Sequence, residues 1–204
     1  MSRLILIDGE NLIYGLRKLA GKDGNRATRE KLLGFDFRGL LNEVLEDEQK
    51  AQIMFYGAKL RKFSADKAIL KKTTEAIKWQ SYLVNDLQKQ GIQFVKVGNL
   101  RARETDPCPG CGHHEWHLLE KGVDVGLAVR MVAAASRNTE IVLVSSDTDL
   151  LPAVREAKEK SRIIYIGYEN SLVVSLVRNT HITKVITAQM VANHLQKNQK
   201  KVSR

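Results

Sequence analysis

Two short apolar runs constrain this chain more than any other feature, because each ends in acidic or small polar residues. The run LILI at 4–7 is followed by Asp8, and the run IVLV at 141–144 is followed by two serines and Asp147. Continuous apolar runs of this length are typical of strands buried on both faces of a parallel sheet. The carboxyl ends of parallel strands meet at one edge, and ligand sites lie outside that edge. We therefore expect Asp8 and Asp147 to face one crevice.

The rest of the chain alternates between predicted helices and strands, which indicates an α/β fold with three layers and a mostly parallel sheet. Helices are predicted at 11–20, 35–48, 65–90, 121–136, 149–160, 170–178 and 188–196, and strands at 4–7, 51–57, 92–97, 140–145, 162–167 and 183–187. Residues 98–119 are rich in proline and glycine, and we predict an inserted loop there. The expected organisation is a single domain over 1–196, followed by a frayed basic tail at 197–204.

The charge balance favours a polyanionic partner. The chain has 33 Lys and Arg against 23 Asp and Glu, a net charge of +10. Nucleic acid is the usual partner of such a chain, and the alternative is a generally basic protein without one. No segment reaches the ~20 apolar residues that a membrane helix needs. The first apolar run is too short for a signal peptide, so we expect a cytoplasmic protein with no membrane partner.

Basic residues follow the first two predicted strands, on the side of the sheet where the acids are expected. The candidates for nucleic-acid binding are Arg17, Lys18, Lys59, Arg61 and Lys62. A basic rim around an acidic centre would hold a phosphate backbone, whereas the alternative is a set of solvated surface residues. Three aromatic residues of the same region, Phe63, Trp79 and Tyr82, are candidates for base stacking. For Trp79 and Tyr82 we favour packing along the long helix instead.

Two further carboxylates are candidates for the same crevice. Asp149 follows Asp147 closely, and Asp124 lies in the first turn of the helix predicted at 121–136. Each has an alternative explanation, because Asp149 can cap the helix that contains Pro152 and the helix dipole favours an acid at Asp124. Like charges that converge at one place need a counter-charge, which a divalent cation supplies.

Three segments together resemble the signature of the NYN domain, a branch of the PIN-like nuclease superfamily. They are IDGEN at 7–11, KGVDVGLA at 121–128 and SSDTDLLPAV at 145–154, in the order and spacing of that family, and the resemblance extends from about residue 3 to residue 190. It implies a Rossmann-like PIN fold and hydrolysis of RNA phosphodiester bonds that depends on Mg²⁺ or Mn²⁺. By motif position Asp8, Asp124 and Asp147 match the metal-binding acids, Asp149 adjoins them, and Asn11 matches the residue that supports the first acid.

One position departs from the pattern of the family. An additional acid usually stands six residues after the one that matches Asp124, and this chain has Arg130 there. If the missing acid was a metal ligand, the protein is a nucleic-acid-binding or adaptor protein without cleavage activity. If it was not, Arg130 borders the crevice and binds a phosphate with two hydrogen bonds, which is the prediction we adopt, while a solvent-facing Arg130 is the third alternative. A phosphohydrolase is disfavoured because IDGEN lacks the DxD nucleophile pair.

The segment DPCPGCGHHEWH at 106–117 contains a separate group of metal-binding residue types. Cys108 and Cys111 have the CxxC spacing of half a zinc ribbon, and His113, His114 and His117 offer two further ligands. We predict a structural Zn²⁺ site in the inserted loop, formed by Cys108, Cys111, His114 and His117. The alternatives are free thiols and a redox pair. The sequence contains no motif that separates RNA from DNA, so DNA is not excluded as a partner.

Overall fold

The computed structural model describes residues 2–21, 24–112 and 114–202, with side chains up to residue 195. Its strands form one seven-stranded sheet in the order β4-β3-β2-β1-β5-β6-β7. Their bounds are β1 Ser2–Asp8, β2 Ala51–Lys59, β3 Gln93–Glu104, β4 Trp116–Lys121, β5 Thr139–Val144, β6 Arg162–Tyr168 and β7 Ile182–Ile186. All neighbours pair in parallel except β3 and β4. The predicted α/β fold with a mostly parallel sheet is thus confirmed.

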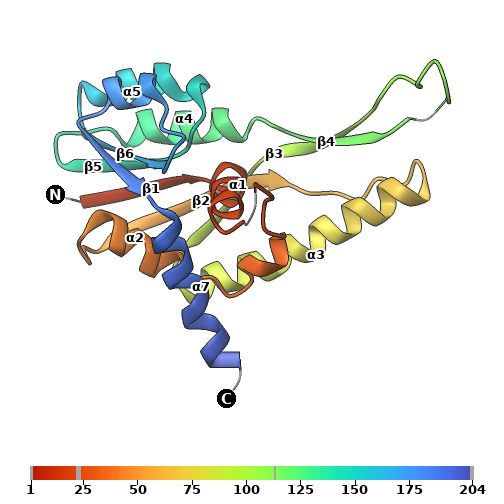
Figure 1. Cartoon of the computed structure of the whole chain (residues 1–204). Helices are drawn as coiled ribbons and strands as arrows, with labels where there is room; N and C mark the ends of the chain where they lie inside the picture. Colours follow the sequence, from red (N-terminus) through yellow and green to blue (C-terminus); the bar gives the residue numbers. More distant parts are fainter. Residues whose placement is uncertain (1, 22–23, 113, 203–204) are drawn as a thin grey trace.

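Helices cover both faces of this sheet, which gives the three layers seen in Figure 1. One face carries α1 Gly9–Leu19, α2 Phe37–Leu45, α3 Lys67–Lys89 and α7 Ala188–Val202, and the other carries α4 Val123–Ala134, α5 Leu151–Lys158 and α6 Val174–Asn179. Two short 3₁₀ helices, η1 Arg29–Leu32 and η2 Thr148–Leu150, complete the fold. Among the described residues, no helix combines the length and apolar character needed to span a membrane.

The two apolar runs form the centre of the sheet. Residues 4–7 of β1 are at most 4% exposed, and residues 141–144 of β5 are 0% exposed. Because successive side chains of a strand point to opposite faces, each run supplies both cores. Ile5 and Val142 belong to the core under α1 and α2, and Leu6 and Leu143 belong to the core under α4 and α5. The strand order reverses between β1 and β5, so the residues that follow these two strands lie at the topological switch point.

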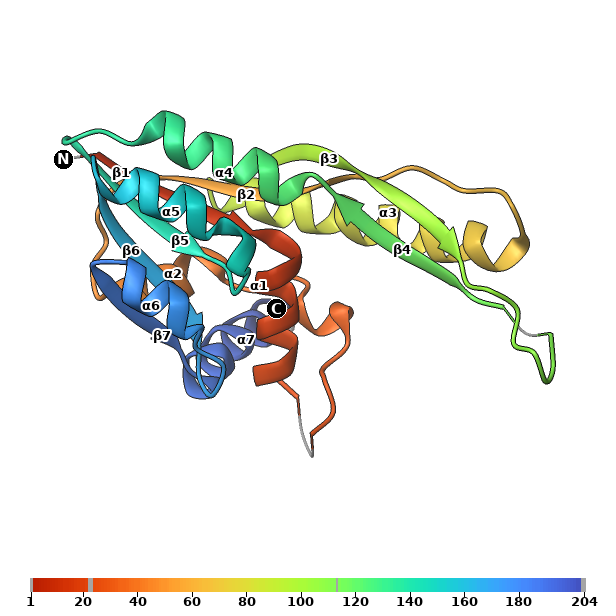
Figure 2. The ribbon, with the colours of Figure 1, turned by 90° about the horizontal axis from the view of Figure 1, so that it is seen from above.

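The prediction of a loop over 98–119 is wrong at both of its ends, where residues 98–104 belong to β3 and residues 116–119 belong to β4. β3 continues to Glu104 and pairs with β4 in antiparallel register from Asn99↔Lys121 to Glu104↔Trp116. We call residues 98–121 the β3–β4 arm, and Figure 2 shows it extending away from the body of the molecule beside α3. The outward face of this arm carries charged side chains at alternate positions, so the sequence shows no continuous apolar run there.

Several helix boundaries also differ from the prediction, among them the start of α6 at Val174 in place of 170. The first helix begins at Gly9, directly after β1, because Asp8 caps it. The helix predicted at 149–160 is divided into η2 and α5. The last helix continues to Val202, through residues that we predict as part of a tail.

Candidate active site

Asp8 ends β1 and links it to the neighbouring strand β5. Its Oδ1 accepts a hydrogen bond from the backbone N–H of Asn11 at 3.2 Å, and its Oδ2 accepts one from the hydroxyl of Ser145 at 3.1 Å. Burial raises the pKa of Asp8, these two hydrogen bonds oppose the rise, and the negative charge of Asp147 adds to it. A cation at this place would relieve both the burial cost and the repulsion between the two acids.

Asp147 is held beside Asp8 by the same serine. The Ser145 hydroxyl oxygen accepts the backbone N–H of Asp147 at 3.1 Å, and Oδ1 of Asp147 accepts the N–H of Asp149 at 2.9 Å. The side-chain oxygen of Asn11 accepts the N–H of Ser146 at 3.0 Å, while it is the backbone N–H of Asn11 that donates to Asp8. Hydrogen bonds therefore link the segment at 7–11 to the segment at 145–154. Asp8 and Asp147 both cap helices, and they do so in addition to sharing Ser145.

Asp124 and Asp149 lie at the same edge of the sheet without joining this pair. α4 ends where the chain enters the amino end of β5, so the first turn of α4 lies at the carboxyl edge. This turn contains Asp124, and α4 packs against η2. Asp149 is exposed in η2 and is the cap of neither η2 nor α5. In the part of the chain that the structure describes, no three His, Cys, Asp or Glu side chains form a metal-binding group. Two neighbouring carboxylates nevertheless fit Mg²⁺, which commonly uses one or two carboxylates together with waters and substrate phosphates.

Glu120 is a carboxylate near this edge that is not among the residues predicted from the sequence. Burial raises its pKa to about 7, and the nearby charges of Glu10 and Asp8 contribute in the same direction. Along β4, the half-buried positions alternate as Trp116, Leu118 and Glu120. Because Leu119 is exposed while Glu120 is half-buried, the residue types of this strand give no signal of an inward glutamate.

Four of the predicted basic residues are exposed near the carboxyl edge. Lys59, Arg61 and Lys62 lie at the end of β2 and in the segment that leaves it, and Lys18 lies on α1. The guanidinium of Arg61 stacks over the ring of Phe63 at 4.6 Å from its centroid. All four side chains are accessible to a polyanion.

The other two predicted basic residues have different surroundings. Nε of Arg17 donates to the carbonyl oxygen of Ala27 at 2.7 Å, which holds the segment after α1. Arg130 contacts Oε1 of Gln52 at 3.5 Å and lines a cavity with the first residues of β1, β2 and β5. Six residues advance a helix by about 9 Å, which brings Arg130 to the amino edge, opposite the acids. Arg130 therefore does not border the crevice as predicted, because it lies at the opposite edge of the sheet.

The aromatic side chains of the long helix are not equivalent. Trp79 is half-buried against the core, as predicted, and the guanidinium of Arg29 lies 5.1 Å from its ring centroid. The packing prediction is wrong for Tyr82, which is 49% exposed. Residue 82 lies on the side of α3 that faces away from the sheet.

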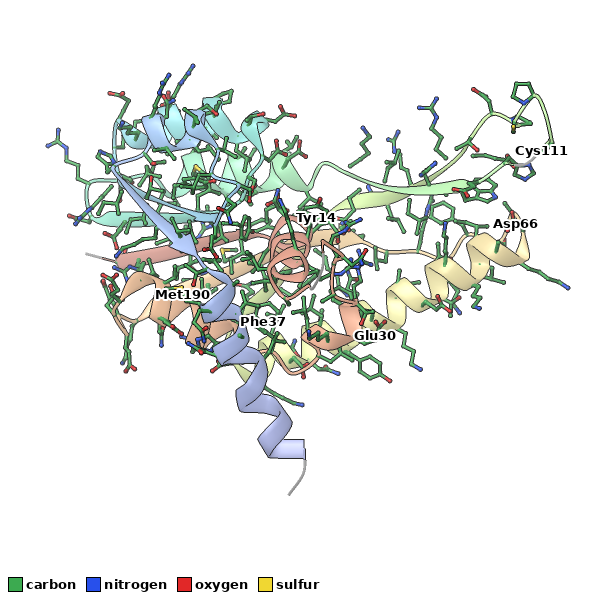
Figure 3. The ribbon with its side chains drawn as sticks, in the orientation of Figure 1. Tyr14, Glu30, Phe37, Asp66, Cys111 and Met190 are labelled. Carbon is green, nitrogen blue, oxygen red and sulfur yellow. The ribbon has the colours of Figure 1, made fainter. Side chains whose placement is uncertain are left out.

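The two cysteines lie at the tip of the β3–β4 arm, far from Tyr14 on α1, as Figure 3 shows for Cys111. Hydrogen bonds from the N–H groups of Gly110 and Cys111 lower the pKa of Cys108, and the Cys111 side chain contributes as well. His114 does not join them, because its Nε2 lies 3.0 Å from Oε1 of Glu104. His117 lies on β4 opposite Arg103, and His113 lies outside the described residues.

Comparisons with known proteins agree with this architecture. The model of the NYN domain matches residues 3–200. A search of curated proteins found no relative that matches the chain. Among solved structures, a protein of unknown function from Vibrio parahaemolyticus has a similar fold, with a TM-score of 0.52 and 17% identity over 91% of this chain and 92% of that chain. Because the family model spans nearly the whole sequence, the chain belongs to the NYN domain family, which is a PIN-like nuclease family.

Proposed function

We propose that this protein is a nuclease that hydrolyses phosphodiester bonds of RNA and depends on Mg²⁺ or Mn²⁺. The observation that carries the proposal is the pairing of Asp8 and Asp147 through one buried serine hydroxyl, at the ends of two neighbouring parallel strands. A site of this kind lies where ligands bind in open α/β sheets. Membership of a PIN-like nuclease family supports the same activity.

Each residue of the site has a distinct part in this proposal. A bound divalent cation lowers the pKa of a coordinated water and stabilises charge on the attacked phosphate. Asp8 and Asp147 would hold the cation, and Ser145 fixes one acid relative to the other. Asn11 braces the backbone before Asp147. We assign Asp124 and Asp149, at the same edge, to the orientation of waters around the cation.

Exposed basic side chains on the carboxyl side of the sheet support a nucleic-acid substrate. Lys18, Lys59, Arg61 and Lys62 are exposed near the carboxyl edge. Contacts of this type bind phosphates without reading the base sequence, so they position a strand across the acids. RNA is the proposed substrate, and a parallel assay with DNA of the same sequence decides between the two.

A second candidate function is binding of nucleic acid without cleavage. It is favoured by the observation that no third metal-binding side chain joins Asp8 and Asp147 within the described residues. This candidate predicts binding of RNA by the wild-type protein with no cleavage at saturating Mg²⁺ or Mn²⁺.

The replacements Asp8→Asn and Asp147→Asn test the proposal. We expect each to lower the rate of cleavage of labelled single-stranded RNA by about a hundredfold or more, which corresponds to about 3 kcal/mol of transition-state stabilisation. RNA binding, measured by fluorescence anisotropy, should persist because the basic residues are unchanged.

Asp106→Asn is the matched control, since Asp106 is exposed near the tip of the arm. It should cleave RNA at the wild-type rate. Cleavage by both site variants at the wild-type rate would overturn the assignment of the acids.

A further inference from the structure

A cavity of about 300 Å³ begins at Gly9, the residue that follows Asp8. It is bounded by the start of α1, the end of β2, the middle of α3 and the base of the β3–β4 arm. Asp8 pairs with Tyr56, which lines the cavity, and Gly9 lines it as well. A Cβ atom at Gly9 would meet the Phe55 ring at 2.2 Å and the Tyr56 carbonyl oxygen at 2.4 Å. Glycine is therefore needed for α1 to lie this close to β2.

The walls of the cavity are largely aromatic and aliphatic. Phe94 stacks on Phe55 with ring centroids 5.7 Å apart, and Trp79 and Leu118 line the cavity from α3 and β4. Apolar and aromatic walls with a few fixed polar groups are typical of sites for small planar ligands, and the volume is at the lower end of their range.

The polar groups of the cavity are not equally available to a ligand. Glu10 is paired with Arg29 at 2.7 Å, and Nε2 of Gln80 donates to the carbonyl oxygen of Ala58 at 3.1 Å. Glu120 receives a hydrogen bond from the N–H of Ala58, and no described side chain makes a hydrogen bond or ion pair with it. Glu120 is thus a carboxylate that lines an apolar cavity and keeps acceptor capacity for a ligand.

We propose that this cavity binds a nucleobase of the substrate and that Glu120 makes it selective for guanine. The inference rests on the proposed function for the source of the base, because a strand whose phosphate lies at Asp8 and Asp147 can place a neighbouring base in the cavity. Bases of single-stranded RNA are read by stacking and by hydrogen bonds to their Watson–Crick edges.

Guanine is the base whose edge complements a carboxylate. Its N1–H and its N2 amino group are adjacent donors, and a carboxylate accepts both with its two oxygens. Adenine and cytosine each place one donor next to an acceptor, and uracil places its single donor between two acceptors. An acceptor of these bases that faced Glu120 would be left without a partner, which disfavours their binding.

A binding experiment tests the cavity without any cleavage. The chain has two tryptophans, so in the Trp116→Phe protein the intrinsic fluorescence reports Trp79 in the cavity wall. At pH 8, where Glu120 is mainly in its charged form, we expect guanosine monophosphate to change this fluorescence and to bind about tenfold or more tightly than adenosine, cytidine or uridine monophosphate. Glu120→Gln should remove the preference, because an amide offers one acceptor oxygen in place of two.

Two further variants make the result specific. Ala76→Phe fills the cavity from α3 and should weaken binding of all four nucleotides. Glu159→Gln, at the exposed end of α5 and remote from the cavity, should retain the preference for guanosine. Equal binding of the four nucleotides by the wild-type protein, or a preference that survives Glu120→Gln, overturns the inference.

Mapping the cleavage sites separates this inference from the proposed function. With a pyrimidine oligonucleotide that contains a single guanosine, we expect cleavage next to that guanosine, and Glu120→Gln should spread it along the strand. Uniform cleavage by the wild-type protein contradicts guanine selectivity but still supports the proposed nuclease activity. Selective binding of guanosine monophosphate without cleavage of any RNA supports the proposed guanine site and contradicts the proposed nuclease activity.

Discussion

Glu120 occupies a half-buried position in which a negative charge is disfavoured. Its pKa rises from 4.5 to about 7. Between these values the folded chain holds a proton at Glu120 that the unfolded chain has lost. The stability that this proton provides is fully present below about pH 4.5 and is lost as the pH rises toward 7. Above pH 7 the folded protein carries the whole cost of burying the charged form.

We therefore predict that Glu120→Gln stabilises the protein in a pH-dependent manner. The free energy of unfolding, measured by urea denaturation, should rise by as much as about 3 kcal/mol at pH 8 and by less than about 1 kcal/mol at pH 5. Glu159→Gln should change it little at either pH. An equal gain for Glu120→Gln at both pH values would show that packing, rather than charge, is responsible.

At the scale of elements, the β3–β4 arm has two different faces. Trp116 packs toward α3, where its Nε1 donates to Asp66 at 2.6 Å. The other face exposes Arg101 opposite Leu119 and Arg103 opposite His117. Both arginines lie outside the nucleic-acid contacts predicted from the sequence, because a loop is predicted over this segment. As part of a strand, both point to the same side of the arm.

We predict that the outward face of the arm contributes to RNA binding. The double replacement Arg101→Ala and Arg103→Ala should weaken binding and lower the slope of log affinity against log salt by about 1.4, since each phosphate contact contributes ~0.7 for single strands. Arg137→Ala with Lys160→Ala removes two exposed charges at the amino edge and serves as the control. An unchanged slope for the arm variant, or an equal fall for the control, contradicts a specific role for this face.

The tip of the arm remains the predicted zinc site. Cys108 and Cys111 lie together, with backbone N–H groups that stabilise the thiolate form of Cys108. We expect elemental analysis of untagged protein, purified without added metal, to find about one zinc per chain, lost in the Cys108→Ser, Cys111→Ser double variant. The histidines must then move from their observed positions, since His114 is next to Glu104. Absence of zinc together with two freely titrating thiols would reject the site.

At the scale of the whole molecule, the sheet decides which residues become neighbours. β1 lies between β2 and β5. The carboxyl end of β1 therefore has Asp147 on the side of β5 and the cavity on the side of β2. The proposed metal pair and the proposed base pocket therefore lie on the two sides of the carboxyl end of β1, with Asp8 in the pair and Gly9 in the pocket wall. A change in register between β1 and β5 would separate Asp8 from Ser145, and the ion pair between the register partners Arg3 and Glu140 supports that register.

The sequence by itself determined the features that depend on local patterns. The buried strands at 4–7 and 141–144 could be predicted because a strand covered on both faces must be apolar throughout. The pairing of Asp8 and Asp147 followed from the rule that parallel strands end at one edge. The long helix that ends before Gly91 was predicted from its length and from the glycine at its end, which adopts a φ of 68°.

Only the tertiary structure decided the features that depend on contacts between distant segments. Glu120 approaches Asp8 because β3 carries β4 back along the edge of the sheet. Arg130 lies beside Gln52 because α4 runs from the carboxyl edge of the sheet to its amino edge. Neither contact leaves a local pattern, since pairing and packing between remote residues set both. The physical reason is that the hydrophobic periodicity of a segment indicates which of its faces is buried. Which residues cover that face depends on how distant segments pack in the fold.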